Sequence, residues 1–234
     1  MGLNKFLVFV MIIGIVRFVF ADSCPVSGLA DFCGSADGQY TVTLKKIEFS
    51  TDGVNFITIG ESSGTPFNIA SMNVGSDFQS FISNKSIPAG TYNYIRITMS
   101  RTISFKGRTT QPDVSGKYYY TSPDTGTSSH YPYFPIAASC STWPPSGGCP
   151  AYGTVSIHIP DDAVEHHASG ETMEFVNNGQ DERITRKLSP PIVVAEGQPV
   201  TLRIKFYTQG MIGFSNELGN YTVFPMPPVQ ELSY

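Results

Sequence analysis

Residues 91–105, TYNYIRITMSRTISF, decide the fold class of this chain. Apolar side chains alternate with polar ones along most of this stretch, which is the period of a β-strand with one buried face. The alternation shifts at Tyr94-Ile95, which predicts a bulge or a change of face. Because fifteen residues is long for one strand, we expect a bend near Ser100-Arg101.

The flanking sequence predicts more strands and no long helix. Residues 39–59 alternate on both sides of Asp52-Gly53, a dipeptide that is typical of a hairpin turn. Residues 76–83 fit one helical turn or a strand. Further short strands are expected at 67–74, 117–121, 154–159, 173–176, 192–194, 200–207 and 221–224. Many short strands separated by Gly/Pro turns indicate an all-β fold, a β-sandwich of the Ig-like or transthyretin-like type.

The first residues are typical of an export signal. Lys5 precedes an apolar run of eleven residues, 6–16, and small residues follow at Val19 and Ala21. A membrane-spanning helix needs about 20 apolar residues, so this run indicates export rather than anchoring. We expect cleavage before Asp22. The alternative is retention as a short membrane tether, because Arg17 and the apolar residues after it make an irregular signal.

We expect one β-sandwich domain after this signal peptide (1–21). A Cys-containing N-terminal extension covers 22–38, the domain covers 39–224, and a Pro-rich tail covers 225–234. Within the domain, residues 106–153 form a long insertion rich in Tyr and Pro, with little periodicity. Such stretches inside a compact domain are usually functional or form a lid.

Composition narrows the function classes. Only 15% of residues are charged, whereas 12 Tyr and 16 Phe are present, and the formal net charge is −4. This composition is typical of an extracellular β protein and not of a disordered chain. No basic stripe occurs, which argues against nucleic acid as a partner.

The four cysteines form two pairs with the same spacing. We predict the local disulfides Cys24–Cys33 and Cys140–Cys149, because exported proteins oxidise their thiols and short loops close easily. The two crossed pairings stay open as alternatives. A four-cysteine zinc site does not fit, since zinc modules space paired ligands two to four residues apart.

No motif indicates catalysis. The sequence lacks a Gly-x-Ser-x-Gly elbow and a phosphate-binding loop, so we expect a protein that is not an enzyme and uses no cofactor. One cluster could bind a divalent metal, and its alternative is a solvated turn between strands. Its members are Asp161, Asp162, Glu165, His166 and His167. His158 lies on the strand face opposite Val155 and Ile157, so we expect it to face solvent.

Aromatic residues of the insertion are the candidate interaction site. Exposed rings stack on sugars or on protein partners, and Tyr and Trp are common interface anchors. The alternative is a loop packed onto its own domain by those rings and clamped by Cys140–Cys149. The candidates are Tyr118, Tyr119, Tyr120, Tyr131, Tyr133, Phe134 and Trp143. Glycosylation sequons also begin at Asn84 and Asn220.

Residues 41–105 resemble an uncharacterised family of secreted bacterial transthyretin-like or β-sandwich domains. The matching segments are 42–49, 67–69 and 87–97, and the most characteristic motif is Pro88-Ala-Gly-Thr-Tyr92. The resemblance implies a β-sandwich in an exported or surface protein and supplies no catalytic residues. The insertion and both cysteine pairs lie outside it.

Two functions follow as expectations. The first is an exported cell-surface structural subunit that self-associates into a filament or pilus-like homopolymer. Strand addition between subunits would use 22–38 or 220–234 as the donor segment. The second is a secreted monomeric module that binds a glycan or another ligand through the insertion's rings. Neither needs a stable membrane span after the leader is removed.

Overall fold

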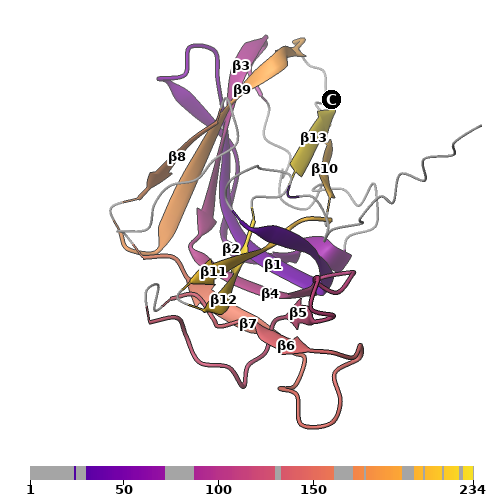
Figure 1. Cartoon of the computed structure of the whole chain (residues 1–234). Helices are drawn as coiled ribbons and strands as arrows, with labels where there is room; N and C mark the ends of the chain where they lie inside the picture. The colour runs from indigo at the N-terminus through magenta and orange to yellow at the C-terminus, as the bar shows by residue number, and fades with distance from the viewer. Residues whose placement is uncertain are drawn as a thin grey trace, which may run out of the picture.

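The computed structural model describes an all-β chain, which confirms the sandwich class (Figure 1). The described residues are 24, 30–71, 87–129, 133–160, 171–176, 178–196, 203–207, 209–217, 219–226 and 229–233. The strands are β1 (Phe32–Ser50), β2 (Phe56–Asn68), β3 (Gly90–Ser100), β4 (Thr102–Arg108), β5 (Tyr118–Tyr120), β6 (Ala138–Cys140), β7 (Val155–His158), β8 (Glu171–Phe175), β9 (Asp181–Val194), β10 (Arg203–Tyr207), β11 (Ile212–Glu217), β12 (Asn220–Pro225) and β13 (Val229–Ser233), with a 3-10 turn at Ile69–Ser71. The particular Ig-like or transthyretin-like type stays a prediction.

Two long bent runs connect the two halves of the structure. The last residues of β1 pair with β2 and β3, whereas its earlier residues 35–41 pair with β4. β3 and β4 follow each other along the chain, interrupted only at Arg101, and both pair antiparallel with β1. They therefore bend where β1 bends. One half is the sheet β2-β1-β3-β9-β8, and the other contains β4, β5, β6, β7, β11 and β12 (Figure 1). The bend expected at Ser100-Arg101 is confirmed.

The irregularity expected at Tyr94-Ile95 is also present. The register between β3 and β9 shifts between Tyr92 and Tyr94, where Tyr92 pairs with Ile192 and Tyr94 pairs with Lys187. Residues 188–191 of β9 bulge at this point and include a cis peptide bond before Pro190. The extra residues thus lie on β9, whereas Tyr92 and Ile95 of β3 are both buried.

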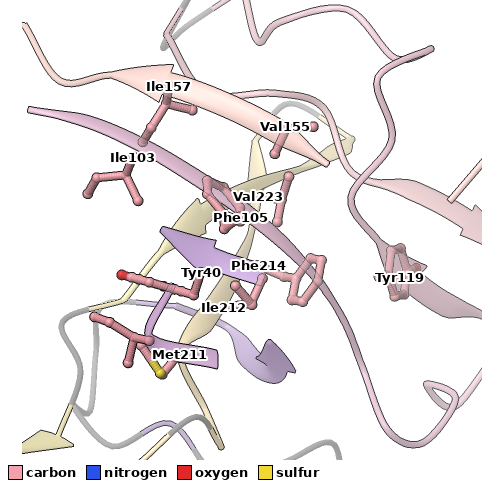
Figure 2. Packing of buried hydrophobic residues seen from close by; sticks show 11 residues of the cluster. Tyr40, Ile103, Phe105, Tyr119, Val155, Ile157, Met211, Ile212, Phe214 and Val223 are labelled. Carbon is pink, nitrogen blue, oxygen red and sulfur yellow. The ribbon is translucent and has the colours of Figure 1, made fainter. Parts of the chain in front are cut away.

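The second half curls into a closed ring of strands. β4 pairs with β1, β1 with β11, and β11 with β12. Residues 135–137 bond to β12, after which β6 pairs with β5 and β5 with β4. The ring encloses a core to which β4 and β7 contribute every second side chain. Members of this core include Ile103, Phe105, Val155, Ile157 and Phe214 (Figure 2). The opposite side chains of β4 and β7 therefore face outward.

The first half has its own core on one face of its sheet. Ile47, Phe49, Ile95 and Ile192 are nearly fully buried there. The other face carries charge. Glu48 accepts a hydrogen bond of 2.7 Å from Arg96 and forms an ion pair with Lys46, whose Nζ lies 2.9 Å from Glu48 Oε1. Glu48 is buried, which opposes ionisation, but these two partners lower its pKa overall.

Several elements differ from the expected ones. β1 begins at Phe32, inside the stretch expected to be irregular, and Val229–Ser233 of the Pro-rich tail forms β13 beside β10. β9 begins at Asp181, eleven residues before the predicted strand at 192, and β11 was not predicted. The hairpin at 39–59 and the strands at 173–176 and 221–224 are confirmed.

Some predictions lie outside the described residues. These are the leader at 1–21, the segment 76–83 and the sequon at Asn84. Within the part of the chain that is described, no helix is long and apolar enough to cross a bilayer.

Candidate functional site

Both predicted disulfides form within their local pairs. Cys24 bonds to Cys33 and Cys140 bonds to Cys149, with Cα–Cα distances of 5.1 and 5.9 Å. The second bridge closes the loop that follows β6, at the end of the molecule opposite the tips of β3 and β9 (Figure 1). We call residues 138–153, together with β5, the aromatic lobe.

The aromatic lobe has a small core of its own. Tyr120, Ala138 and Cys140 are buried there, and Trp143 and Tyr152 pack against them while remaining partly exposed. The Trp143 ring lies 4.8 Å from that of Tyr152 and 5.8 Å from that of Tyr120, both with T-shaped geometry. Edge-to-face contacts of this kind stabilise aromatic pairs beyond simple burial. The bridge and the rings therefore hold Trp143 in place.

Two cations of β4 lie against these rings. The Arg108 guanidinium carbon is 4.4 Å from the centre of the Trp143 ring, and Lys106 Nζ is 4.4 Å from that of Tyr152. Both side chains are half-buried and stand on the same face of β4, two positions apart. The cation–π contacts place positive charge directly beside the rings of the lobe.

A carboxylate fixes one ring from the neighbouring strand. The Tyr152 hydroxyl donates a hydrogen bond of 2.9 Å to Asp37 Oδ2 on β1. Burial raises the pKa of Tyr152, and the bond to Asp37 raises it further, whereas Arg108 lowers it. Tyr152 therefore stays a neutral donor across the physiological pH range, and the lobe is joined to β1 as well as to β4.

Six of the seven predicted aromatics lie in the described residues, two of them buried and four half-buried. Tyr119 and Tyr120 are buried, Tyr119 among the rings of Phe32, Phe214 and Tyr221 in the larger core. Tyr118 and Trp143 are half-buried with ring centres 6.3 Å apart. Tyr133 and Phe134 are half-buried and contact each other, and Phe134 packs on Phe224, away from the lobe. Tyr131 lies outside the described residues.

Other candidate residues are not brought together in what the structure describes. Asp161, Asp162, Glu165, His166 and His167 all lie outside the described residues. Elsewhere in the described chain, no group of three His, Cys, Asp or Glu side chains is arranged to hold a metal ion. His158 is exposed, as expected, and its Nδ1 lies 3.2 Å from the hydroxyl of Thr102.

Sequence reasoning missed four residues of this site: Asp37, Lys106, Arg108 and Tyr152. Lys106 and Arg108 continue the alternation of Ile103 and Phe105, so the strand period could have placed them on the outer face of β4. Asp37 and Tyr152 are distant in sequence and carried no such signal.

Comparisons of the chain with protein-family models, with curated proteins and with solved structures found no match. Function is therefore inferred from the geometry of the site.

Proposed function

We propose that this protein is an exported, non-catalytic binding module that holds a carbohydrate ligand against its aromatic lobe. The observation that carries the proposal is the placement of Trp143, half-buried and held by three contacts on a loop that a disulfide closes. Indole rings bind sugars by stacking, and a rigid ring loses little entropy on binding. Two disulfides and the leader sequence support an extracellular location.

The surroundings of Trp143 supply the other groups that a sugar needs. Tyr118 places a second half-buried ring beside it, and Lys106 and Arg108 supply hydrogen-bond donors at its border. A few polar groups around apolar rings are the usual composition of a small-ligand site. The sandwich of Ig-like or transthyretin-like type serves as the rigid support of the lobe.

Fluorescence tests this proposal directly, because Trp143 is the only tryptophan of the chain. We expect titration with soluble polysaccharides to shift its emission, and Trp143→Ala to weaken retention in polysaccharide affinity gels at least tenfold. Phe56→Ala is the matched control, since Phe56 lies 3.8 Å beneath Arg96 in an equivalent cation–π pair on the other half of the sheet. Equal loss in both variants, or unchanged retention of Trp143→Ala, would contradict the proposal.

Self-assembly into a surface polymer is the second candidate. It is favoured by the open edges of the large sheet, because β2 and β8 each pair with one strand in the described chain. Against it, β1 already pairs Phe32–Gly34 with β11, and the last strands β12 and β13 pair with β11 and β10. β2 also carries two register shifts and Pro66, which are devices that protect edges from pairing.

Size measurement decides between the two functions. The binding module predicts a monomer by light scattering at high concentration, whereas the surface polymer predicts high-mass filaments by electron microscopy. Filaments that persist after removal of 220–234 would exclude that segment as the donor strand.

A further inference from the structure

The outward face of β4 carries a row of polar side chains that ends at the aromatic lobe. Figure 2 shows Ile103 and Phe105 of β4 and Val155 and Ile157 of β7 pointing into the core, so the alternate residues point away from it. On this outer face, Ser104 and Ser156 are joined by a hydrogen bond of 2.6 Å. Strand pairing places them side by side in register.

The row continues on both sides of this serine pair. Towards one end, the Thr102 hydroxyl lies 3.2 Å from His158 Nδ1. Towards the lobe, the Thr154 hydroxyl donates a bond of 2.7 Å to Gln39 Oε1 on β1, beside Lys106. Thr102, Ser156 and His158 are exposed. These hydroxyl, amide and imidazole groups can donate to or accept from a ligand that lies along the strand.

The row ends in two cations that form no ion pair within the described residues. Across the described residues, the structure has no carboxylate within ion-pair distance of Lys106 or Arg108, whereas Lys45, Lys46, Arg96 and Arg183 on the other half each have one. The Asp37 carboxylate on β1 accepts a hydrogen bond from the Tyr152 hydroxyl and forms no ion pair with either cation in the described residues. Arg108 bonds to the Thr109 carbonyl through one nitrogen, and its fork has further donors. Lys106 and Arg108 can thus each form an ion pair with an anionic ligand.

We propose that this row, from His158 to Trp143, is one elongated face for an acidic polysaccharide, whose carboxylates pair with Lys106 and Arg108. The seven residues of β4 span about 20 Å at roughly 3.3 Å per residue, so the face accommodates several sugar units. The polar row bonds to sugar hydroxyls, and the rings of the lobe stack on a pyranose face. The inference rests on the proposed carbohydrate function and adds that the carbohydrate is negatively charged.

Matched probes separate the two proposals. The disulfide-bonded protein is titrated by calorimetry with polygalacturonate and alginate, and with the neutral ester of each, which keeps the backbone and removes the charge. We expect at least one acid form to bind at least tenfold tighter than its ester at low salt. The difference should shrink at 1 M salt, where the Debye length falls to about 3 Å.

Charge-removing variants test the two residues. The double variant Lys106→Gln, Arg108→Gln should lose at least tenfold in affinity for the acid form and clearly less for the ester, because Gln keeps a hydrogen-bond donor and removes only the charge. Lys187→Gln, an exposed charge on β9, is the control and should change neither affinity. Circular dichroism of each variant checks that it is folded.

Each result has one meaning. Equal binding of acid and ester, with the double variant unaffected, overturns the acidic class and leaves the carbohydrate function standing. Binding of neither form overturns both proposals.

Discussion

The buried guanidinium of Arg101 donates a hydrogen bond of 3.0 Å through Nε to the backbone carbonyl of Asp181. Arg101 is only 1% exposed, and its Nη2 donates a second bond of 3.0 Å to the carbonyl of Val176. Its own amide bonds to the carbonyl of Gln180. One side chain at the bend between β3 and β4 therefore holds the turn that connects β8 to β9.

Replacement of Arg101 should destabilise the protein strongly. Arg101→Met keeps the bulk but removes the donors to the Asp181 and Val176 carbonyls, and bonds from a charged group are worth about 1.5–3 kcal/mol. We expect a loss of about 3 kcal/mol in the free energy of unfolding, measured in urea. Arg183→Met is the control, since Arg183 pairs only at 3.3 Å with the exposed Glu174. A similar loss in both variants would show that Arg101 has no special role.

A buried carboxyl close to this bend makes stability depend on pH. Glu182 is 3% exposed and its Oε2 has no partner in the described structure. Burial raises the pKa of Glu182 to about 7, although the charge of Arg101 opposes the shift. Because the folded state binds this proton more tightly than the unfolded chain, stability is greatest below the ordinary pKa and falls as pH rises towards about 7. At about 1.4 kcal/mol per pKa unit, the loss is about 3 kcal/mol.

Glu182→Gln should remove this fall in stability between about pH 4.5 and 7. The measurement is the urea midpoint at a series of pH values, with Glu174→Gln on the neighbouring strand as the variant that keeps the fall. Glu48 and Asp181 affect stability at lower pH. Burial opposes ionisation of both carboxyls, but their partners lower both pKa values. The stability that they contribute is therefore lost as the pH falls. A wild-type stability that rises from pH 5 to 7 would contradict this assignment.

The sequence predicted the strands whose apolar residues alternate and missed the first part of β9, whose pattern is masked by charge. Residues 91–105 alternate clearly, so their strand and bend were foreseeable. The first part of β9 was not, because Glu182 is buried in place of an apolar residue. A buried arginine such as Arg101 is equally invisible, since hydropathy places arginine at the surface.

The candidate site was predicted in part. The local disulfides and the ring-rich insertion were visible in the sequence, and Trp143 and Tyr118 are the predicted rings that lie half-buried in the aromatic lobe. Which rings are buried was not visible, because Tyr119 and Tyr120 are adjacent in β5 and face two different cores. That outcome depends on contacts with Phe214 and Tyr152, which are distant in sequence.

Gly34 is required where β1 changes partner from β11 to β4. A Cβ at this position would lie 2.2 Å from the Arg108 carbonyl oxygen, which is backbone and cannot rotate away. We expect Gly34→Ala to lower the free energy of unfolding by at least about 2 kcal/mol, at the upper part of the range for overpacking. Gly126→Ala, where nothing lies within 4 Å of the added carbon, should change stability by less than about 0.5 kcal/mol. Equal stability of the two variants would show that the strands can separate here at little cost.

The bridge Cys140–Cys149 should govern the order of the aromatic lobe alone. Replacing both cysteines with Ala removes the constraint on Trp143, so we expect its emission to move to longer wavelength while the cores of both sheet halves stay folded. The matched variant lacks Cys24 and Cys33, whose bridge anchors β1 far from the lobe in sequence. It should lose about 2–3 kcal/mol of stability without changing the emission of the folded state. Far-ultraviolet circular dichroism checks that both variants remain β-structured. If loss of Cys140–Cys149 leaves the emission unchanged, the rings alone hold Trp143 and the bridge is not needed for the binding site.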